Sequence, residues 1–179
     1  MNLSTSDMSL SAKRMIQGRM YQSMEEALYA CEELYPQSRK MALKRAEEVQ
    51  SIKYEIRDRA EKIGYKRTCR DSIPICRGEC CRWHFPQNIG AVDFYLALLR
   101  LSRKGRFSLV RKLQDTENKS YQCPLLCEDG CFFSFNERPI VCTNAYPCFA
   151  EREYWELIQT KKKRIKNLYF SMEEILQLT

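Results

Sequence analysis

The sequence predicts a small, mainly α-helical domain in which two cysteine-rich loops are organised around metal, together with an N-terminal helical hairpin. Three observations lead to this fold class. Apolar residues recur at helical spacing in several stretches of the chain. Charged residues make up 30% of the 179 residues, which is typical of a soluble helical protein. Ten cysteines are present, and eight of them fall between Cys76 and Cys148.

The first helix of the expected hairpin follows residues 1–18, which have no clear periodicity and are expected to fray. Ser23-Met24-Glu25-Glu26 has the pattern of a capping box, in which serine and glutamate satisfy each other's backbone amides. Pro36 is expected to end this helix. Cys31 lies on the apolar stripe, so we interpret it as a packed core thiol and not as a ligand.

The second helix of the hairpin is expected from Ser38 to Ile63. Ala42, Val49 and Ile56 recur every seven residues and form a narrow apolar seam on a strongly charged helix. This pattern is typical of an antiparallel partner, and the seam must be buried against the rest of the chain or against a second copy. Residues 1–66 form the expected hairpin segment.

Residues 67–150 form the expected cysteine-cluster segment. Within it, residues 91–103 form the most apolar helix of the chain, so we predict that this helix is the core helix and that Gly105 closes it. A further short helix is expected from Phe107 to Leu113.

The second cysteine-rich loop follows, and its Asp129-Gly130 pair predicts a tight turn. A short strand is expected over residues 131–135. Residues 151–179 form the C-terminal segment, which should pack on the cysteine-cluster segment. A helix is expected to about Phe170, and Ser171-Met172-Glu173-Glu174 repeats the capping box and should open a final short helix.

Composition limits the compartment and the partners. Apolar residues make up 44% of the chain, and no apolar run approaches the ~20 residues that span a bilayer. The N-terminus lacks the apolar region of a signal peptide, so we expect a cytoplasmic protein without a membrane partner. Thiols stay reduced in that compartment, which favours metal over disulfides.

The cysteines are the candidate metal ligands. Zinc and iron–sulfur clusters each take about four ligands, and thiolates suit both. Eight thiols therefore provide one site with spares, or two sites. The predicted ligands are Cys76, Cys80, Cys81, Cys123, Cys127, Cys131, Cys142 and Cys148.

The spacings exclude the commonest motifs. No C-x2-C is present, which argues against a plain zinc ribbon and against the bacterial ferredoxin pattern. Cys123, Cys127 and Cys131 are spaced C-x3-C-x3-C, unlike the cysteine triad of radical enzymes that use S-adenosylmethionine. Cys80 and Cys81 are adjacent, and consecutive side chains of an extended chain point in divergent directions. We therefore expect them to serve two metals, or to act as one ligand and one supporting thiol.

Two further residues, His84 and Arg138, have two interpretations each. His84, the only histidine, is either a packed ring or a ligand, and Cys69 stands apart as an additional candidate ligand. Arg138 either neutralises a thiolate-rich site or caps a turn that Pro139 makes rigid.

At these residues the chain resembles the YkgJ-type cysteine-cluster family, bacterial and archaeal proteins described as a zinc- or iron-chelating domain. The resemblance covers roughly residues 69–150 and consists of ordered submotifs: Gly78-Glu79-Cys80-Cys81, Cys123-Pro124-Leu125-Leu126, Asp129-Gly130-Cys131-Phe132-Phe133, and Arg138-Pro139-Ile140-Val141-Cys142 followed by Cys148. The usual C-x2-C-x2-C-C is replaced by Cys76 with C-x3-C-C, and Cys127 is an extra cysteine. These departures leave open which four thiols form any one site.

The resemblance implies a metal-binding protein that holds an iron–sulfur cluster or zinc, and little beyond that. Electron transfer or redox chemistry is the first role that we expect for such a centre. The alternative is a structural zinc site that staples a helical interaction module without catalytic activity. Whether the chain is an enzyme stays open, since no glycine-rich nucleotide loop or catalytic carboxylate pair is recognisable.

The expected partner is a protein that docks on the N-terminal hairpin, and a homo-oligomer is a second option. The formal net charge of +7 does not indicate nucleic acid, because the basic residues are scattered. We interpret the densest run, Lys161 to Arg164, as a solvated helix face.

Overall fold

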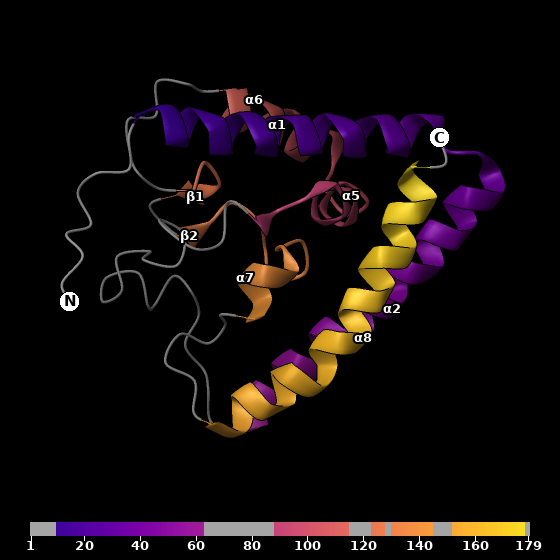
Figure 1. Cartoon of the computed structure of the whole chain (residues 1–179), viewed down its shortest axis with the longest axis vertical. Helices are drawn as coiled ribbons and strands as arrows, with labels where there is room; N and C mark the ends of the chain where they lie inside the picture. Colours follow the sequence, from indigo (N-terminus) through magenta and orange to yellow (C-terminus); the bar gives the residue numbers. More distant parts are fainter. Residues whose placement is uncertain (1–9, 63–87, 115–122, 128–129, 145–151, 178–179) are drawn as a thin grey trace.

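The structure is a computed structural model that describes residues 10–62, 88–114, 123–127, 130–144 and 152–177 (Figure 1). The described part of the chain is mainly helical, which confirms the mainly α-helical part of the predicted fold class. Its helices and strands are α1 (Leu10–Glu33), α2 (Pro36–Lys62), α5 (Ala91–Leu98), α6 (Arg103–Gln114), β1 (Leu126–Cys127), β2 (Gly130–Cys131), α7 (Ile140–Asn144) and α8 (Arg152–Gln177).

The long helices form two packed groups. α1 packs on α5 and α6, whereas α2 packs along α8, and α5 also contacts α8. α1 and α2 diverge from their connection at Leu34 and Tyr35, and no extensive contact joins them (Figure 1). The predicted pairing of the first two helices as a hairpin is therefore wrong, because each one buries its apolar stripe against helices that come later in the chain.

The seam of α2 is buried within the chain. Ala42, Val49, Ile52 and Ile56 are each at most 1% exposed, and the helix that covers them is α8. Small alanine side chains let two helix backbones approach closely, and the branched side chains fill the remaining space. The seam is thus buried against the rest of the chain, and its burial does not require a second copy.

One core runs through all three segments expected from the sequence. It contains Met20 and Val49 from the first segment, Phe94 and Leu109 from the second, and Met172 from the third. α8 therefore packs on both earlier segments.

Both predicted capping boxes lie inside helices and begin none. Ser23 lies within α1 and Ser171 within α8. Met24 and Met172, which follow these serines, are 0% exposed. Met20 continues the buried stripe of α1 one turn upstream, and Leu168 does so for α8. Burying the apolar side chains of the preceding turn stabilises the longer helix by more than the roughly 1 kcal/mol that a cap would contribute at the serine.

The start of α1 corrects the expectation that residues 1–18 fray, because the helix begins at Leu10; residues 1–9 lie outside the described part. Pro36 is the first residue of α2 and not the end of the preceding helix. Proline suits this position, since the first turn of a helix leaves its amides without intrahelical acceptors. The predicted end of this helix, Ile63, lies outside the described residues.

The predicted core helix is confirmed, and its end is corrected. Every residue of α5 from Val92 to Leu98 is buried. The chain then turns, and the Ser102 hydroxyl accepts a hydrogen bond from the Gly105 amide at 3.2 Å. Ser102 thus caps α6, and Gly105 lies in the first turn of α6 instead of closing α5.

The predicted strand after the tight turn is shorter than expected. β1 and β2 form a two-residue antiparallel pair, in which Leu126 faces Cys131 and Cys127 faces Gly130. Gly130 has a φ of 119°, which side chains other than glycine rarely adopt. Phe133 leaves the strand and enters the core, where its ring lies edge-on to Phe94 at 6.4 Å. This contact fixes the cysteine-bearing pair to α5.

Gly18 tests whether α1 extends as far upstream as the structure shows. It lies within α1, and nothing lies within 4 Å of a Cβ added there. Gly18→Ala should therefore raise the free energy of unfolding by roughly 0.5–1 kcal/mol, measured by urea denaturation with far-UV circular dichroism. Gly105→Ala is the control and should gain less, because its Cβ would lie 3.1 Å from Leu101 Cδ2. A neutral or destabilising Gly18→Ala would show that this turn is not helical.

Candidate metal centre

Cys142 is the predicted ligand whose surroundings are best defined. It lies in α7, its amide donates to the Pro139 carbonyl at 3.0 Å, and the residue packs against the core while remaining partly exposed. Burial raises the pKa of the Cys142 thiol well above its usual value. Negative charge on Cys131 and Cys123 raises it further, whereas the Arg138 guanidinium lowers it.

Three predicted ligands therefore lie close enough to influence one another electrostatically: Cys123, Cys131 and Cys142. Such influence reaches much further than a metal–sulfur bond of about 2.3 Å. Among the residues that the structure describes, no three Cys, His, Asp or Glu side chains have an arrangement that could hold a metal ion. The three thiols are thus neighbours, and their coordination of a metal ion stays a prediction.

The other predicted ligands fall into two groups. Cys127 lies on β1, and its thiol points to the Leu125 carbonyl at 3.9 Å, a weak contact. The remaining candidates lie outside the described residues: Cys76, Cys80, Cys81 and Cys148, and with them Cys69 and His84.

Cys31 behaves as the sequence predicts. It lies on α1, is partly buried and packs against the core. Burial raises the pKa of its thiol. Its electrostatic neighbours include Arg106 of α6 and the Tyr95 hydroxyl of α5.

A buried carboxylate, which is not among the residues predicted from the sequence, lies next to the turn that carries Cys142. Asp93 is 4% exposed. Its Oδ1 accepts hydrogen bonds from the Ile140 amide at 3.0 Å and from the Tyr169 hydroxyl at 2.7 Å, and its Oδ2 accepts from the Gly90 amide at 3.2 Å. One carboxylate thereby joins the starts of α5 and α7 to α8.

The electrostatics of Asp93 follow from this enclosure. Burial raises the pKa of Asp93, and the three donated hydrogen bonds and the charge of Lys53 oppose that rise. Burial and the adjacent carboxylate raise the pKa of Tyr169 well above its usual value, so Tyr169 stays protonated and donates. A sequence signal for Asp93 does exist, because it is the only charged residue in the apolar helix and lies three residues after Gly90, where a side chain can reach back to the helix start.

A buried lysine holds the same turn from the other side. Lys53 of α2 is 1% exposed, and its Nζ donates to the Arg138 carbonyl at 2.6 Å. Burial lowers the pKa of Lys53 to about 8, and the charge of Asp93 opposes the decrease. Lys53 was not predicted, because on a helix with many charged residues nothing local distinguishes a buried lysine from a solvated one.

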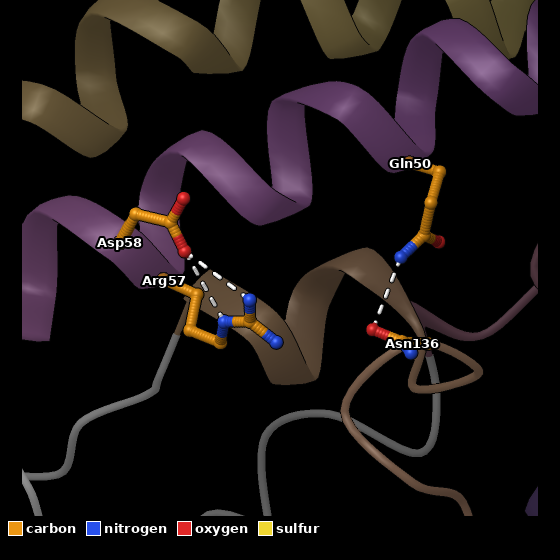
Figure 2. A network of polar contacts seen from close by, with 4 residues as sticks. All are labelled: Gln50, Arg57, Asp58 and Asn136. Atoms are coloured by element: carbon orange, nitrogen blue, oxygen red, sulfur yellow. Dashed lines mark hydrogen bonds and ion pairs between the residues drawn. The ribbon is translucent and has the colours of Figure 1, made fainter.

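α2 makes further contacts with the chain just before Arg138. Figure 2 shows Gln50 reaching from α2 to Asn136, and the hydrogen bond from its Nε2 to Asn136 Oδ1 is 3.1 Å long. In the same view, Arg57 pairs with Asp58 at 3.2 Å. The Arg57 guanidinium also lies 5.9 Å from the centre of the Phe135 ring. Several side chains of α2 therefore hold the segment that leads to Cys142.

Arg138 lies in a turn and close to a predicted ligand, and its role at a thiolate-rich site stays a prediction. Its amide donates to the Ser134 carbonyl at 2.9 Å, which closes a turn. Its guanidinium charge also lowers the pKa of Cys142. The Arg138 Nε atom is buried and has no hydrogen-bond partner within the described ranges of the chain. Burying a donor without an acceptor costs folding free energy. An acceptor that the described residues do not supply would remove this cost.

Comparisons of the chain with models of protein families, with curated proteins and with solved structures find no match. The resemblance to the YkgJ-type family stays a prediction. No helix in the described part of the chain has the length and apolar character needed to cross a membrane.

The buried lysine makes stability depend on pH. Its pKa is lowered from 10.5 to about 8, so between these values the unfolded chain binds more protons than the folded one. The contribution of Lys53 to folding stability should therefore rise with pH, by up to ~1.4 kcal/mol per pH unit. The free energy of unfolding of the wild type, relative to that of Lys53→Met, should therefore increase from pH 7 to pH 10 by an amount on the order of 1–3 kcal/mol.

Lys163→Met removes an exposed lysine of α8 and is the control, since other titrating groups are common to all three proteins. Urea denaturation across this pH range measures the differences. Identical pH profiles for Lys53→Met and Lys163→Met would contradict the burial of Lys53.

Proposed function

We propose that this protein binds metal and holds an iron–sulfur cluster or a zinc ion through clustered cysteine thiolates, with Cys123, Cys131 and Cys142 among the ligands. The observation that carries this proposal is the gathering of thiols from two separate segments: the chain that leads into and forms the β1–β2 pair, with Cys123 and Cys131, and α7, with Cys142. Both segments attach to helices: Phe133 packs on α5, and Lys53 of α2 holds the carbonyl that precedes α7.

The chemistry of these donors fits a thiolate-bound metal. A buried thiol with a raised pKa is protonated when alone, and a metal ion makes the thiolate favourable by replacing the proton. Centres with four thiolates carry net negative charge, and the cations Lys53 and Arg138 lie beside Cys142. The buried Arg138 Nε would find an acceptor in a metal-bound sulfur, as outer donors at metal sites commonly do.

In this proposal, the remaining metal ligands are other cysteines of the sequence. Cys76, Cys80, Cys81 and Cys148 remain predicted ligands, and Cys127 is the next candidate. The resemblance to the YkgJ-type family supports the same set and allows one or two sites.

A structural role for the metal is the second candidate function, and one observation favours it. The chain around Cys142 is bound to α2 and α5 through Lys53 and Asp93, so a metal there would tie the cysteine loops to the helical frame. Metal binding would then supply folding free energy. A redox centre differs from this staple in having a reversible reduction potential.

The metal content of the full chain tests the proposal. Protein purified without oxygen should contain zinc or iron close to one or two sites per chain, by elemental analysis. An iron–sulfur cluster should add visible absorption that is bleached by dithionite, whereas zinc gives a colourless protein. Folded protein that contains neither metal and takes up neither from solution would contradict the proposed function.

Substitution of single cysteines tests the division between ligand and core thiols. Cys142→Ser should lower metal affinity by more than the ~10–100-fold that loss of an outer partner costs, and should lower stability with it. Cys31→Ser, a matched control on α1, should lower stability slightly and leave metal content unchanged. Loss of metal in Cys31→Ser, or full metal content in Cys142→Ser, would show that the assignment is wrong.

A further inference from the structure

We infer that Asp93 and Lys53 are positioning residues that hold the backbone on both sides of Pro139 so that Cys142 is presented to the metal. This inference rests on the proposed function. Neither residue is a predicted ligand, and each acts through hydrogen bonds to the main chain.

Asp93 supplies the cap that α7 lacks locally. α7 begins at Ile140, and the preceding residue is Pro139, whose side chain has no hydrogen-bond acceptor. The first amides of a helix need acceptors from elsewhere. Asp93, 47 residues away in sequence, accepts from the Ile140 amide at 3.0 Å and fixes where α7 starts.

Lys53 fixes the chain two residues earlier. Its Nζ donates to the Arg138 carbonyl at 2.6 Å, and that carbonyl precedes the rigid Pro139 ring. The two bonds thus hold one short, stiff stretch of backbone from α2 and from α5. The Cys142 amide donates to the Pro139 carbonyl at 3.0 Å, so the position of this stretch is passed directly to Cys142.

The two side chains also balance each other. Lys53 is 1% exposed and Asp93 is 4% exposed, and each charge favours the charged form of the other. The hydroxyl of Tyr169 donates to Asp93 at 2.7 Å and holds the carboxylate from α8. Because removing one of two buried charges that favour each other leaves the remaining charge less compensated, the geometry of the turn should respond to a change in either residue.

Cobalt(II), added to the full chain as a spectroscopic substitute for zinc, tests the inference. Its thiolate-to-metal absorption reports how many sulfurs bind, and titration gives the affinity. Asp93→Asn and Lys53→Met should each weaken cobalt binding by ~10–100-fold, the range for partners that orient ligands. The sulfur absorption per bound cobalt should fall as well, because Cys142 is no longer held in place.

Val49→Ala is the matched control, since it removes a buried side chain from α2 without touching the turn. It should unfold more easily and yet bind cobalt like the wild type. If Asp93→Asn and Lys53→Met bind cobalt as Val49→Ala does, the positioning role is wrong although the metal site is right. A wild-type chain that binds no cobalt through sulfur would overturn the proposed function together with this inference.

Tyr169→Phe covers the case in which Asp93→Asn does not fold. It deletes only the hydroxyl that donates to Asp93 and keeps the ring. A cobalt affinity between those of the wild type and Lys53→Met is expected. An unchanged affinity in both Tyr169→Phe and Lys53→Met would overturn the inference.

Discussion

The carboxylate of Asp93 is the interaction on which the arrangement around the cysteines depends. Enclosing a charged group costs several kcal/mol, and the structure offsets this with three hydrogen bonds of roughly 1.5–3 kcal/mol each to a charged acceptor. The donors come from Gly90, Ile140 and Tyr169, which belong to the starts of α5 and α7 and to α8. Without Asp93, the amide that opens α7 and the Tyr169 hydroxyl would both lose their acceptor inside the protein.

The helices explain why this carboxylate can join distant parts of the chain. α1 and α2 diverge, and β1, β2 and α7 lie between α1 and the α2–α8 pair (Figure 1). α5 runs through the core and contacts both groups of helices. Asp93 lies in the first turn of α5 and accepts a hydrogen bond from the amide that opens α7. Lys53 of α2 donates to the Arg138 carbonyl, two residues before that amide. The cysteines of the β1–β2 pair and of α7 thus rest on a frame of helices.

Periodicity predicted the helices well, because a buried stripe repeats along a helix whatever covers it. The seam through Val49 and Ile56 and the apolar helix at 91–98 are examples. Local motifs do not predict where these helices begin. The capping boxes at Ser23 and Ser171 lie inside α1 and α8, because burial of the preceding turns extends each helix upstream. The hairpin was wrong because a seam shows that a helix has a partner and not which one. Asp93 and Lys53 were missed because their partners lie 47 and 85 residues away.

We propose that sulfur from these cysteines binds metal on this frame. X-ray absorption at the metal edge of the loaded full chain tests it most directly, because this method identifies the atoms bound to the metal and their distances. Sulfur atoms bound directly to the metal are expected, at about 2.3 Å for zinc, with a short iron–iron distance in addition if the centre is an iron–sulfur cluster. A first shell made mainly of nitrogen and oxygen would contradict this proposal.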